Sequence, residues 1–463
     1  MGESSEPRNL SDVRVDLEQD CMALSSINHT EKNDHWVQYS IEWRDLQNRF
    51  KSRHPATEQE VDMSVLAGTG RHNISPAFER ISVFRTKSNG DNVVDQPSIG
   101  LFTMYYVRIH SVPIIHALRS VVKYYPGQDL NGNFIDVPWP YPILVHHYDE
   151  LSAFREELKL KEPEKSCVRE LDGVRHIDLL LGFLDKEVMI KVNEEKERNK
   201  RGYYTFDYRW VSLKRGATVI TNPREYDDGE WTTGVIHSVA GGIFGYSRTD
   251  WSVSYWSMAY DGEYLGRELR FMLEREWDGE VPCEETRVLG SGDDFEESER
   301  TAEVLQAIEC GKTYWEILRG QCRYHSGKTV EIPKTEAPKN IPHLDISALT
   351  VFQVQGLVMV DINAYYDEDH RKNAQGRSPG FKIPILMTSY DQRTYISDCP
   401  CRVCTNKKSL TAIRTALFED YNSITLTSGE EPTDHLYFLC PKKIPIFVFK
   451  TRTWGTAPHS QAN

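Results

Sequence analysis

The feature that most constrains this chain is a pair of apolar segments joined by Asp261-Gly262. Before this dipeptide, Trp251–Tyr260 is rich in the aromatic and β-branched residues that favour strands. After it, Leu269, Phe271 and Leu273 alternate with mostly polar residues, as in an antiparallel strand with one buried face. Asp-Gly between two such segments is a strong hairpin signal. The sequence therefore predicts an antiparallel sheet here.

Shorter segments extend the predicted sheet. Thr218–Ile220 and Thr233–His237 are rich in β-branched residues, and Leu357–Val360 is typical of a short buried strand. Earlier in the chain, Tyr105–Ile109 places apolar residues at every second position. Residues from about 203 to 285 are thus predicted to form an antiparallel, barrel-like β-rich core.

Three segments before residue 203 carry apolar residues at helical spacing. The first spans Ile114 to Val122; Ser111 and Pro113 favour its start, and Pro126-Gly127 favours its end. The second contains Leu151, Phe154 and Leu158, and the third runs from Ile177 to Val188 before a charged segment at 194–201. Shorter helices are expected around Trp43–Phe50, Val304–Ile308 and Tyr314–Leu318, and a rigid extended connector at Val137–Pro142.

These elements predict an α+β fold with helices flanking the central antiparallel, barrel-like β region, and a small C-terminal segment. Residues 1–75 are polar and acidic with little periodicity, and we expect them to be a flexible tail. Residues 76–380 should form the α+β domain. Residues 381–463 should form the C-terminal segment, which contains a cysteine cluster.

Composition favours a globular protein that avoids anionic surfaces. The 463 residues include 10 Trp, 23 Tyr and 17 Phe, enough apolar surface for two or three cores. A net charge of −14 opposes phosphate backbones and anionic lipids, so nucleic-acid and membrane binding are disfavoured. Residues 1–20 lack the apolar core of a signal peptide, and no run of 18 apolar residues occurs. We expect a soluble, intracellular protein, in the cytoplasm or the nucleus.

Two Gly-Lys-Thr triplets, at 311–313 and 327–329, invite an ATP-binding interpretation that their contexts do not support. A phosphate-binding loop needs a further glycine, separated from the Gly-Lys pair by four residues, and Gln306 and Cys322 stand at those positions. Gly290-Ser-Gly292 lacks the third glycine of a dinucleotide loop and is followed by two aspartates. We expect both triplets to lie in turns and predict no ATP binding by this chain.

No other catalytic pattern emerges from the sequence. It has no Gly-x-Ser-x-Gly nucleophile elbow and no cysteine in a recognisable protease context. The polar clusters His146–Glu150 and Asp367–His370 lack the His-Glu-x-x-His spacing of a zinc hydrolase. We therefore assign no catalytic and no cofactor-binding residue, and the chain as it stands is not predicted to be an enzyme.

Three of the nine cysteines cluster as Cys399, Cys401 and Cys404. Cys-x-x-Cys spacing lets two thiolates bind one zinc ion, with Cys399 as a third ligand. Cys440 would supply the fourth, and His435 is the competing donor. Three interpretations stay open: a structural zinc site that stabilises folding, a reduced cysteine-rich loop without metal, and a redox motif.

Several segments, taken in order, resemble a fungal domain of unknown function that precedes a AAA+ ATPase module. The resemblance covers roughly residues 100 to 455. The segments that carry it are Ile109–Pro113, Val121–Pro126, Val137–Tyr141, Tyr204–Trp210, Lys214–Gly216, Tyr260–Gly262, Tyr314–Leu318, Tyr324–Gly327, Gly356–Asp361, Pro432–Pro441 and Phe447–Lys450. The resemblance implies no catalytic residue, because none of these segments is catalytic in the family.

Such proteins would continue past Trp454 into the ATPase module, whereas residues 455–463 are too few for a further domain. The resemblance implies a non-catalytic accessory region that recruits protein partners or substrates for an ATPase, supplied in the same chain or by a paralogue. The aromatic-rich β region is the expected contact surface, although most of its aromatic residues should lie in the core; an exposed patch centred on Trp251–Trp256 would support this expectation. The alternatives are a zinc-stabilised interaction module acting alone and a fragment of an ATP-hydrolysing AAA+ protein.

Overall fold

The structure, a computed structural model, describes residues 37–55, 76–86, 101–122, 124–130, 132–161, 170, 172–221, 232–244, 248–260, 265–282, 286–289, 301–318, 320–331, 351–362, 364–365 and 432–458. These residues form two compact units. The first unit holds the described residues up to 121 and those from 129 to 190. The second holds 122–128 and the described residues from 191 onward.

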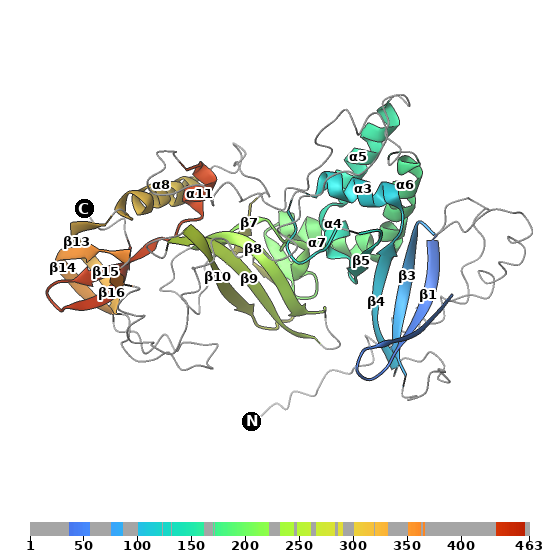
Figure 1. The fold of residues 1–463 in the computed structure, drawn as a ribbon, viewed down its shortest axis with the longest axis horizontal. Coiled ribbons are helices and arrows are strands. Elements are labelled where there is room, and N and C mark those ends of the chain that lie inside the picture. The colour runs from blue at the N-terminus through green and yellow to red at the C-terminus, as the bar shows by residue number, and fades with distance from the viewer. Residues whose placement is uncertain are drawn as a thin grey trace, which may run out of the picture. The chain divides into compact units, whose positions relative to one another are not determined.

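The first unit is built on a mixed five-stranded sheet with the order β2-β1-β3-β4-β5 (Figure 1). Only β1 and β3 are parallel; the other neighbours are antiparallel. The strands are β1 (Val37–Arg44), β2 (Phe50–Pro55), β3 (Phe78–Arg85), β4 (Phe102–Ile109) and β5 (Ile135–Pro138). Because successive side chains of a strand point to opposite faces, the two faces of the sheet carry different sets of residues.

Helices pack on one face of this sheet. They are α3 (Val112–Val121), α4 (Pro142–His146), α5 (Tyr148–Leu160), α6 (Gly173–Leu184) and the π-helical turn η5 (Asp185–Met189). Phe183 of α6 meets Phe78 of β3 edge to face, with ring centroids 5.2 Å apart. Val107 and Ile109 lie on the same sheet face as Phe78, and all three are fully buried. This face therefore carries the apolar core of the unit.

The helices predicted from residues 114, 151 and 177 onward are confirmed. Ser111 caps α3 as expected, because its Oγ accepts a hydrogen bond from the Ile114 N–H at 3.2 Å. The third helix is longer than predicted: η5 and α7 (Ile190–Lys200) continue it through the charged segment. The predicted extended connector is only partly right, since β5 ends at Pro138 and α4 begins at Pro142.

Two predictions for the beginning of the chain are wrong. Residues 37–55, assigned to a flexible tail, form β1 and β2. The helix expected around Trp43–Phe50 is instead the end of β1, a turn and the start of β2. The turn is specified by Asp45, whose Oδ1 accepts hydrogen bonds from the N–H groups of Gln47 and Arg49, and by Asn48 at φ 65°. An aspartate that bonds backbone two residues ahead favours a turn over a helix.

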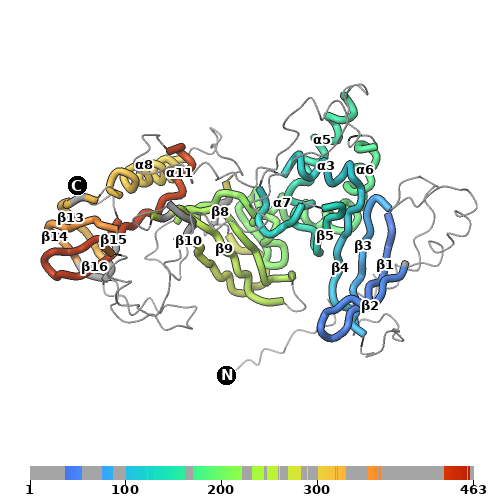
Figure 2. Tube along the Cα trace, in the orientation of Figure 1, coloured from blue at the N-terminus to red at the C-terminus, as the bar shows by residue number. Residues whose placement is uncertain are grey.

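The second unit contains an open antiparallel sheet in the order β10-β9-β8-β7-β12. Its neighbouring strands β10, β9 and β8 are labelled in Figure 2. Its strands are β7 (Thr218–Thr221), β8 (Thr232–Gly242), β9 (Thr249–Tyr260), β10 (Leu265–Glu274) and β12 (Thr286–Val288). The predicted hairpin is confirmed, because β9 and β10 pair from Tyr260–Leu265 to Trp251–Glu274. A short ladder joins β6 (Tyr203–Thr205) to β11 (Glu280–Pro282), and a 3-10 turn, η6, spans Arg209–Val211.

A second group of strands in this unit lies near the end of the chain. The strands β13 (Gln321–Glu331), β14 (Val351–Val360), β15 (Lys443–Val448) and β16 (Thr453–Pro458) pair in that cyclic order. The cycle includes a two-residue ladder between β13 and β16. Two helices accompany them, α8 (Ala302–Ile317) and the short α11 (Asp434–Phe438). The two short helices predicted at 304–318 are thus one helix.

The α+β class is confirmed, but the barrel-like centre at 203–285 is wrong, because the sheet there is open. That helices flank this sheet stays a prediction. The division of the chain also differs from the predicted one. Residues after 432 are not a separate segment: Leu436 and Phe438 share one hydrophobic core with Val235 and Trp256 of the open sheet. Backbone contacts support this, since the Met258 N–H bonds the Leu439 carbonyl at 2.8 Å.

Candidate functional site

The candidate site is an open pocket of about 470 Å³ on the sheet of the first unit. It is lined by Glu42 and Arg44 of β1, Phe50 and Arg53 of β2, and Arg108 of β4. The antiparallel register places Arg53 directly opposite Glu42. Glu42, Glu79 and Tyr106 lie on the face opposite to the helices, by alternation from Phe78 and Val107. The pocket is thus a product of strand pairing, and its walls are charged.

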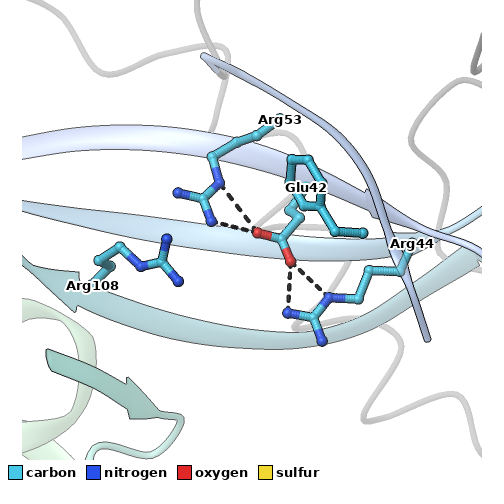
Figure 3. A pocket seen from close by; sticks show the side chains of 5 residues that line it. Glu42, Arg44, Arg53 and Arg108 are labelled. Carbon is cyan, nitrogen blue, oxygen red and sulfur yellow. Dashed lines mark hydrogen bonds and ion pairs between the residues drawn. The ribbon is translucent and has the colours of Figure 1, made fainter. Parts of the chain in front are cut away.

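Glu42 is the centre of the site (Figure 3). Its carboxylate is buried and accepts hydrogen bonds from three side chains. Arg44 Nε and Nη2 both lie 2.7 Å from Oε1, while Arg53 Nη2 and the Tyr106 hydroxyl donate to Oε2 at 2.6 and 2.8 Å. A buried carboxylate is stable only with such donors, because its desolvation is costly.

A second carboxylate, Glu79 of β3, extends the network. Arg53 Nη1 approaches Glu79 Oε2 at 3.4 Å, and His110 Nε2 lies 2.9 Å from Glu79 Oε1. Ser40 also donates to Glu79 Oε2, at 3.5 Å. Arg53 therefore bridges two carboxylates, which fixes its guanidinium between β1 and β3.

Arg108 forms the far wall of the pocket. Its Nε and Nη2 donate to the two oxygens of Asp136 on β5, each at 2.7 Å, in a bidentate fork. The Phe134 ring lies beneath the guanidinium, 4.4 Å from its central carbon to the ring centroid. Figure 3 shows the Arg108 head group extending toward the side of the pocket held by Arg53 and Glu42.

Protonation states follow from this geometry. Burial by itself raises the pKa of the Glu42 carboxyl, but the hydrogen bonds from Arg53, Tyr106 and Arg44 outweigh it and hold the pKa below its ordinary value. Burial also raises the pKa of the Glu79 carboxyl, but the hydrogen bond from His110 and the charges of His110 and Arg53 outweigh it, so the pKa lies below its ordinary value. Burial and the bond to Glu42 raise the pKa of the Tyr106 hydroxyl. At neutral pH both carboxylates are charged and the phenol is protonated.

The lining offers donors rather than reactive groups. Guanidinium groups do not lose protons at ordinary pH and cannot act as general bases. Glu42 is fully engaged as an acceptor, and Phe50 has no chemistry of its own. The pocket can therefore hold a ligand that accepts hydrogen bonds and touches an aromatic edge.

The two Gly-Lys-Thr triplets lie in regular structure, so the prediction of turns is wrong. Gly311 is inside α8, where a Cβ would overlap the Tyr437 carbonyl of α11, so this glycine serves helix packing. Lys312 pairs with Glu309 at 2.7 Å. The second triplet lies inside β13, where Thr329 Oγ1 contacts His325 Nε2 at 3.3 Å. Neither triplet forms a loop that wraps a phosphate. Gly290-Ser-Gly292 lies outside the described residues.

Cys399, Cys401 and Cys404 also lie outside the described residues, as does Asp367–His370, so their metal binding stays a prediction. Cys440 is buried, and its Sγ donates to the Leu436 carbonyl at 3.4 Å. Burial raises the pKa of the Cys440 thiol, which opposes the thiolate that zinc requires. His435 is buried as well, with Nε2 3.0 Å from Thr218 Oγ1. Within the described part of the chain, no three His, Cys, Asp or Glu side chains gather as metal ligands.

Two other features singled out in the sequence, the His146–Glu150 cluster and the aromatic segment Trp251–Trp256, contain side chains that are buried in the fold. His147 is buried at the start of α5, with Nδ1 3.3 Å from Glu150 Oε1. In the aromatic segment, Trp251 and Trp256 are at most 1% exposed. Trp251 Nε1 donates to the Phe206 carbonyl at 2.8 Å, which locks it into the core. No exposed patch is therefore centred on Trp251–Trp256, which weakens the prediction that the aromatic-rich β region is the contact surface.

Comparisons with protein-family models, with curated proteins and with solved structures return no match. The resemblance to a fungal region that precedes a AAA+ ATPase therefore stays a prediction. Across the described residues, no helix has both the length and the apolar character needed to cross a membrane.

The pocket was missed because four of its five lining residues fall in the segment predicted to be a tail. A signal was present: in Val37–Arg44, Ser40, Glu42 and Arg44 alternate with Ile41 and Trp43. This is the period of a strand with one polar face. Nothing in the sequence, however, indicates that β1 would pair with β3 and bring these groups near Arg108.

Proposed function

We propose that this chain is a non-catalytic accessory region that recruits a protein partner through the pocket lined by Glu42, Arg44, Phe50, Arg53 and Arg108. The observation that carries the proposal is an open pocket lined by three arginines, two of which share one buried carboxylate, Glu42. Arginine is enriched at the energetic centres of protein interfaces, as are aromatic residues such as the exposed Phe50.

The arginine side chains of the pocket are already held in place without a ligand, which favours binding of a partner. Arg44, Arg53 and Arg108 are each held by a carboxylate before any ligand arrives. Their side chains remain 26%, 22% and 21% exposed. A partner that binds pre-ordered arginines loses less side-chain entropy than one that must order them. The resemblance to a AAA+ accessory region adds the expectation that the partner works with an ATPase in the same chain or on a paralogue.

The test compares the partners of two tagged full-length chains. The double variant Arg44→Ala/Arg108→Ala removes two walls of the pocket, while Arg155→Ala is a matched control, since its side chain on α5 is 22% exposed and paired with Asp178. Proteins enriched on wild type over the double variant are identified by mass spectrometry, purified and titrated. We expect at least about a tenfold weaker Kd for the double variant, which corresponds to the loss of one or two charge-assisted contacts.

A partner bound equally by wild type and the double variant would overturn the pocket as the recruiting surface. ATP turnover by the purified chain would contradict the non-catalytic part of the proposal. Unfolding monitored by circular dichroism checks that the double variant retains its structure.

A further inference from the structure

The strands β13 to β16, which lie together in Figure 1, carry large apolar side chains on their outer side. Alternate residues of these strands point inward and are buried, as Val358 and Ile446 are. Among the residues that point outward, Tyr324 of β13 stands directly opposite Leu357 of β14. Their side chains are 49% and 54% exposed, and Phe449, which follows β15, is 43% exposed.

Phe447 of β15 connects these side chains into one surface. In the strand register it stands opposite Met359 of β14 and Trp454 of β16. Its ring lies 5.4 Å from that of Trp454 and 5.7 Å from that of Phe449, centroid to centroid. Met359 is two residues from Leu357 and so lies on the same face of β14. The outer patch, as we name this surface, consists of Tyr324, Leu357, Met359, Phe447, Phe449 and Trp454. Single exposed apolar residues are common, but a connected group of this kind is typical of an interaction site.

Positive charges border the outer patch. Lys450 and Arg452 lie in the turn between β15 and β16, directly after Phe449. Lys328 lies on the same face of β13 as Tyr324. All three cations are exposed, and within the residues that the structure describes none of them forms an ion pair. Their charges are therefore available to a ligand, unlike those of arginines already held by carboxylates.

This part of the fold is basic although the chain as a whole is acidic. The segments 320–331, 351–362 and 440–458 contain six lysines and arginines and two acidic residues, whereas the whole chain has 55 basic and 69 acidic residues. Opposite charges across an interface speed association and fix its orientation. The outer patch therefore suits a ligand that carries negative charge next to apolar groups.

A protein segment meets this combination better than a nucleic acid does. Leu357 and Met359 are aliphatic and do not offer the flat faces on which bases stack. A nucleic acid is charged at every nucleotide, and beyond the basic turn it would meet a chain with a net charge of −14. A protein segment can place a few carboxylates beside Lys450 and Arg452 and its apolar side chains on the outer patch.

We propose that the outer patch binds an acidic segment of a protein partner. The apolar side chains of that segment pack against Phe447, Phe449 and Trp454, and its carboxylates pair with Lys450 and Arg452. This surface belongs to the second unit, whereas the pocket belongs to the first. It is a separate interaction surface, and its test does not depend on that of the pocket.

The experiment selects ligands for the full chain from a library of random peptides displayed on phage. We expect the enriched sequences to combine several acidic residues with aromatic or aliphatic ones. The most enriched peptide is then synthesised and titrated by fluorescence anisotropy. Lys450→Glu/Arg452→Glu should weaken its Kd at least about tenfold, because two charge-assisted contacts become repulsive. A version of the peptide with lysine in place of each acidic residue should bind this variant more tightly than it binds wild type.

A second variant tests the apolar contacts. Leu357→Ser/Phe449→Ser should also weaken the Kd about tenfold or more, because it removes apolar surface that the peptide would bury. Both side chains are exposed, so the variant should keep its fold, which circular dichroism checks. Lys186→Glu/Lys191→Glu is the matched charge control at two exposed lysines, and Leu160→Ser, at a side chain 87% exposed, is the apolar control. Neither control should change the Kd.

Several outcomes would overturn the inference. One is the absence of enriched acidic peptides, and another is a selected peptide whose Kd neither patch variant changes. Tighter binding of oligo-uridine RNA than of the peptide, lost in both patch variants, would assign the surface to nucleic acid. Dimerisation in sedimentation experiments that Leu357→Ser/Phe449→Ser abolishes would assign it to a second copy of the chain. Loss of peptide binding in Arg44→Ala/Arg108→Ala, with no loss in the patch variants, would place the peptide in the pocket of the first unit.

Discussion

At the scale of single residues, Glu42 should matter more for stability than any exposed acid of the pocket. It is buried and holds Arg44, Arg53 and Tyr106 together. Glu42→Ala would leave two guanidinium groups without their shared carboxylate, and breaking such a buried pair costs about 3–5 kcal/mol. We expect a loss of this size in the free energy of unfolding of the first unit, measured by urea denaturation.

Asp136 provides the matched control for this prediction. It also pairs with an arginine of the pocket, but its side chain is 41% exposed. Asp136→Ala should cost about 1 kcal/mol or less, because water replaces an exposed partner. Equal losses for the two variants would show that burial does not distinguish these carboxylates.

His435 should make the second unit sensitive to moderate acid. Burial lowers its pKa from an ordinary 6.5 to about 4, so the folded state binds its proton more weakly than the unfolded state. Stability is then complete above pH 6.5 and falls as the pH drops toward 4. The loss is about 3 kcal/mol, since one pKa unit corresponds to 1.36 kcal/mol.

The check is urea denaturation of wild type and His435→Gln between pH 7 and 4. Glutamine keeps a polar group near Thr218 but cannot be protonated, so the variant should lose this part of the pH dependence. If the free energy of unfolding falls equally with decreasing pH in both proteins, the acid sensitivity belongs to other groups.

At the scale of elements, the contact of α8 with α11 depends on a glycine. A Cβ at Gly311 would overlap the Tyr437 backbone. Gly311→Ala should therefore destabilise the second unit by about 1–3 kcal/mol, as overpacking does in other cores. Gly182 of α6 is the control, because a Cβ there meets no atom within 4 Å. Gly182→Ala should stabilise the first unit by about 0.5–1 kcal/mol through helix propensity. Thermal unfolding of both variants measures the difference, and two changes of the same sign would contradict the packing argument.

Elements with a strong local sequence pattern were predictable. Elements that depend on individual side-chain hydrogen bonds to the backbone were not. The helix at 112–121 has a cap, a periodic apolar face and a stop, all within a short segment. The β9–β10 hairpin has strand-forming segments on both sides of an Asp-Gly dipeptide. The turn between β1 and β2 depends on the Asp45 side chain bonding the Gln47 N–H and on Asn48 at φ 65°, and neither leaves a periodic pattern in the sequence.

At the scale of the whole molecule, the two units should respond separately to substitution. Each has its own core, and the chain passes between them at residues 121–129 and again at 190–191. In differential scanning calorimetry we expect Glu42→Ala to shift one transition and Gly311→Ala the other. A single transition moved by both variants would show that the units unfold together.

The sequence by itself determined the α+β class, most of the helices, the central hairpin and the failure of the two Gly-Lys-Thr triplets as phosphate loops. Those features depend on residues within about ten positions of one another, so periodicity, turn residues and motif spacing record them. Tertiary structure alone decided which aromatic residues of the β region are buried, Trp251 and Trp256 among them, and that Glu42 lies beside Arg53 and Tyr106. Tyr106 is 64 residues from Glu42 along the chain, and only the pairing of β1 with β3 and of β3 with β4 brings them together. Strand pairing at that distance leaves no periodic mark in a single sequence, because the register is set by the folded sheet as a whole.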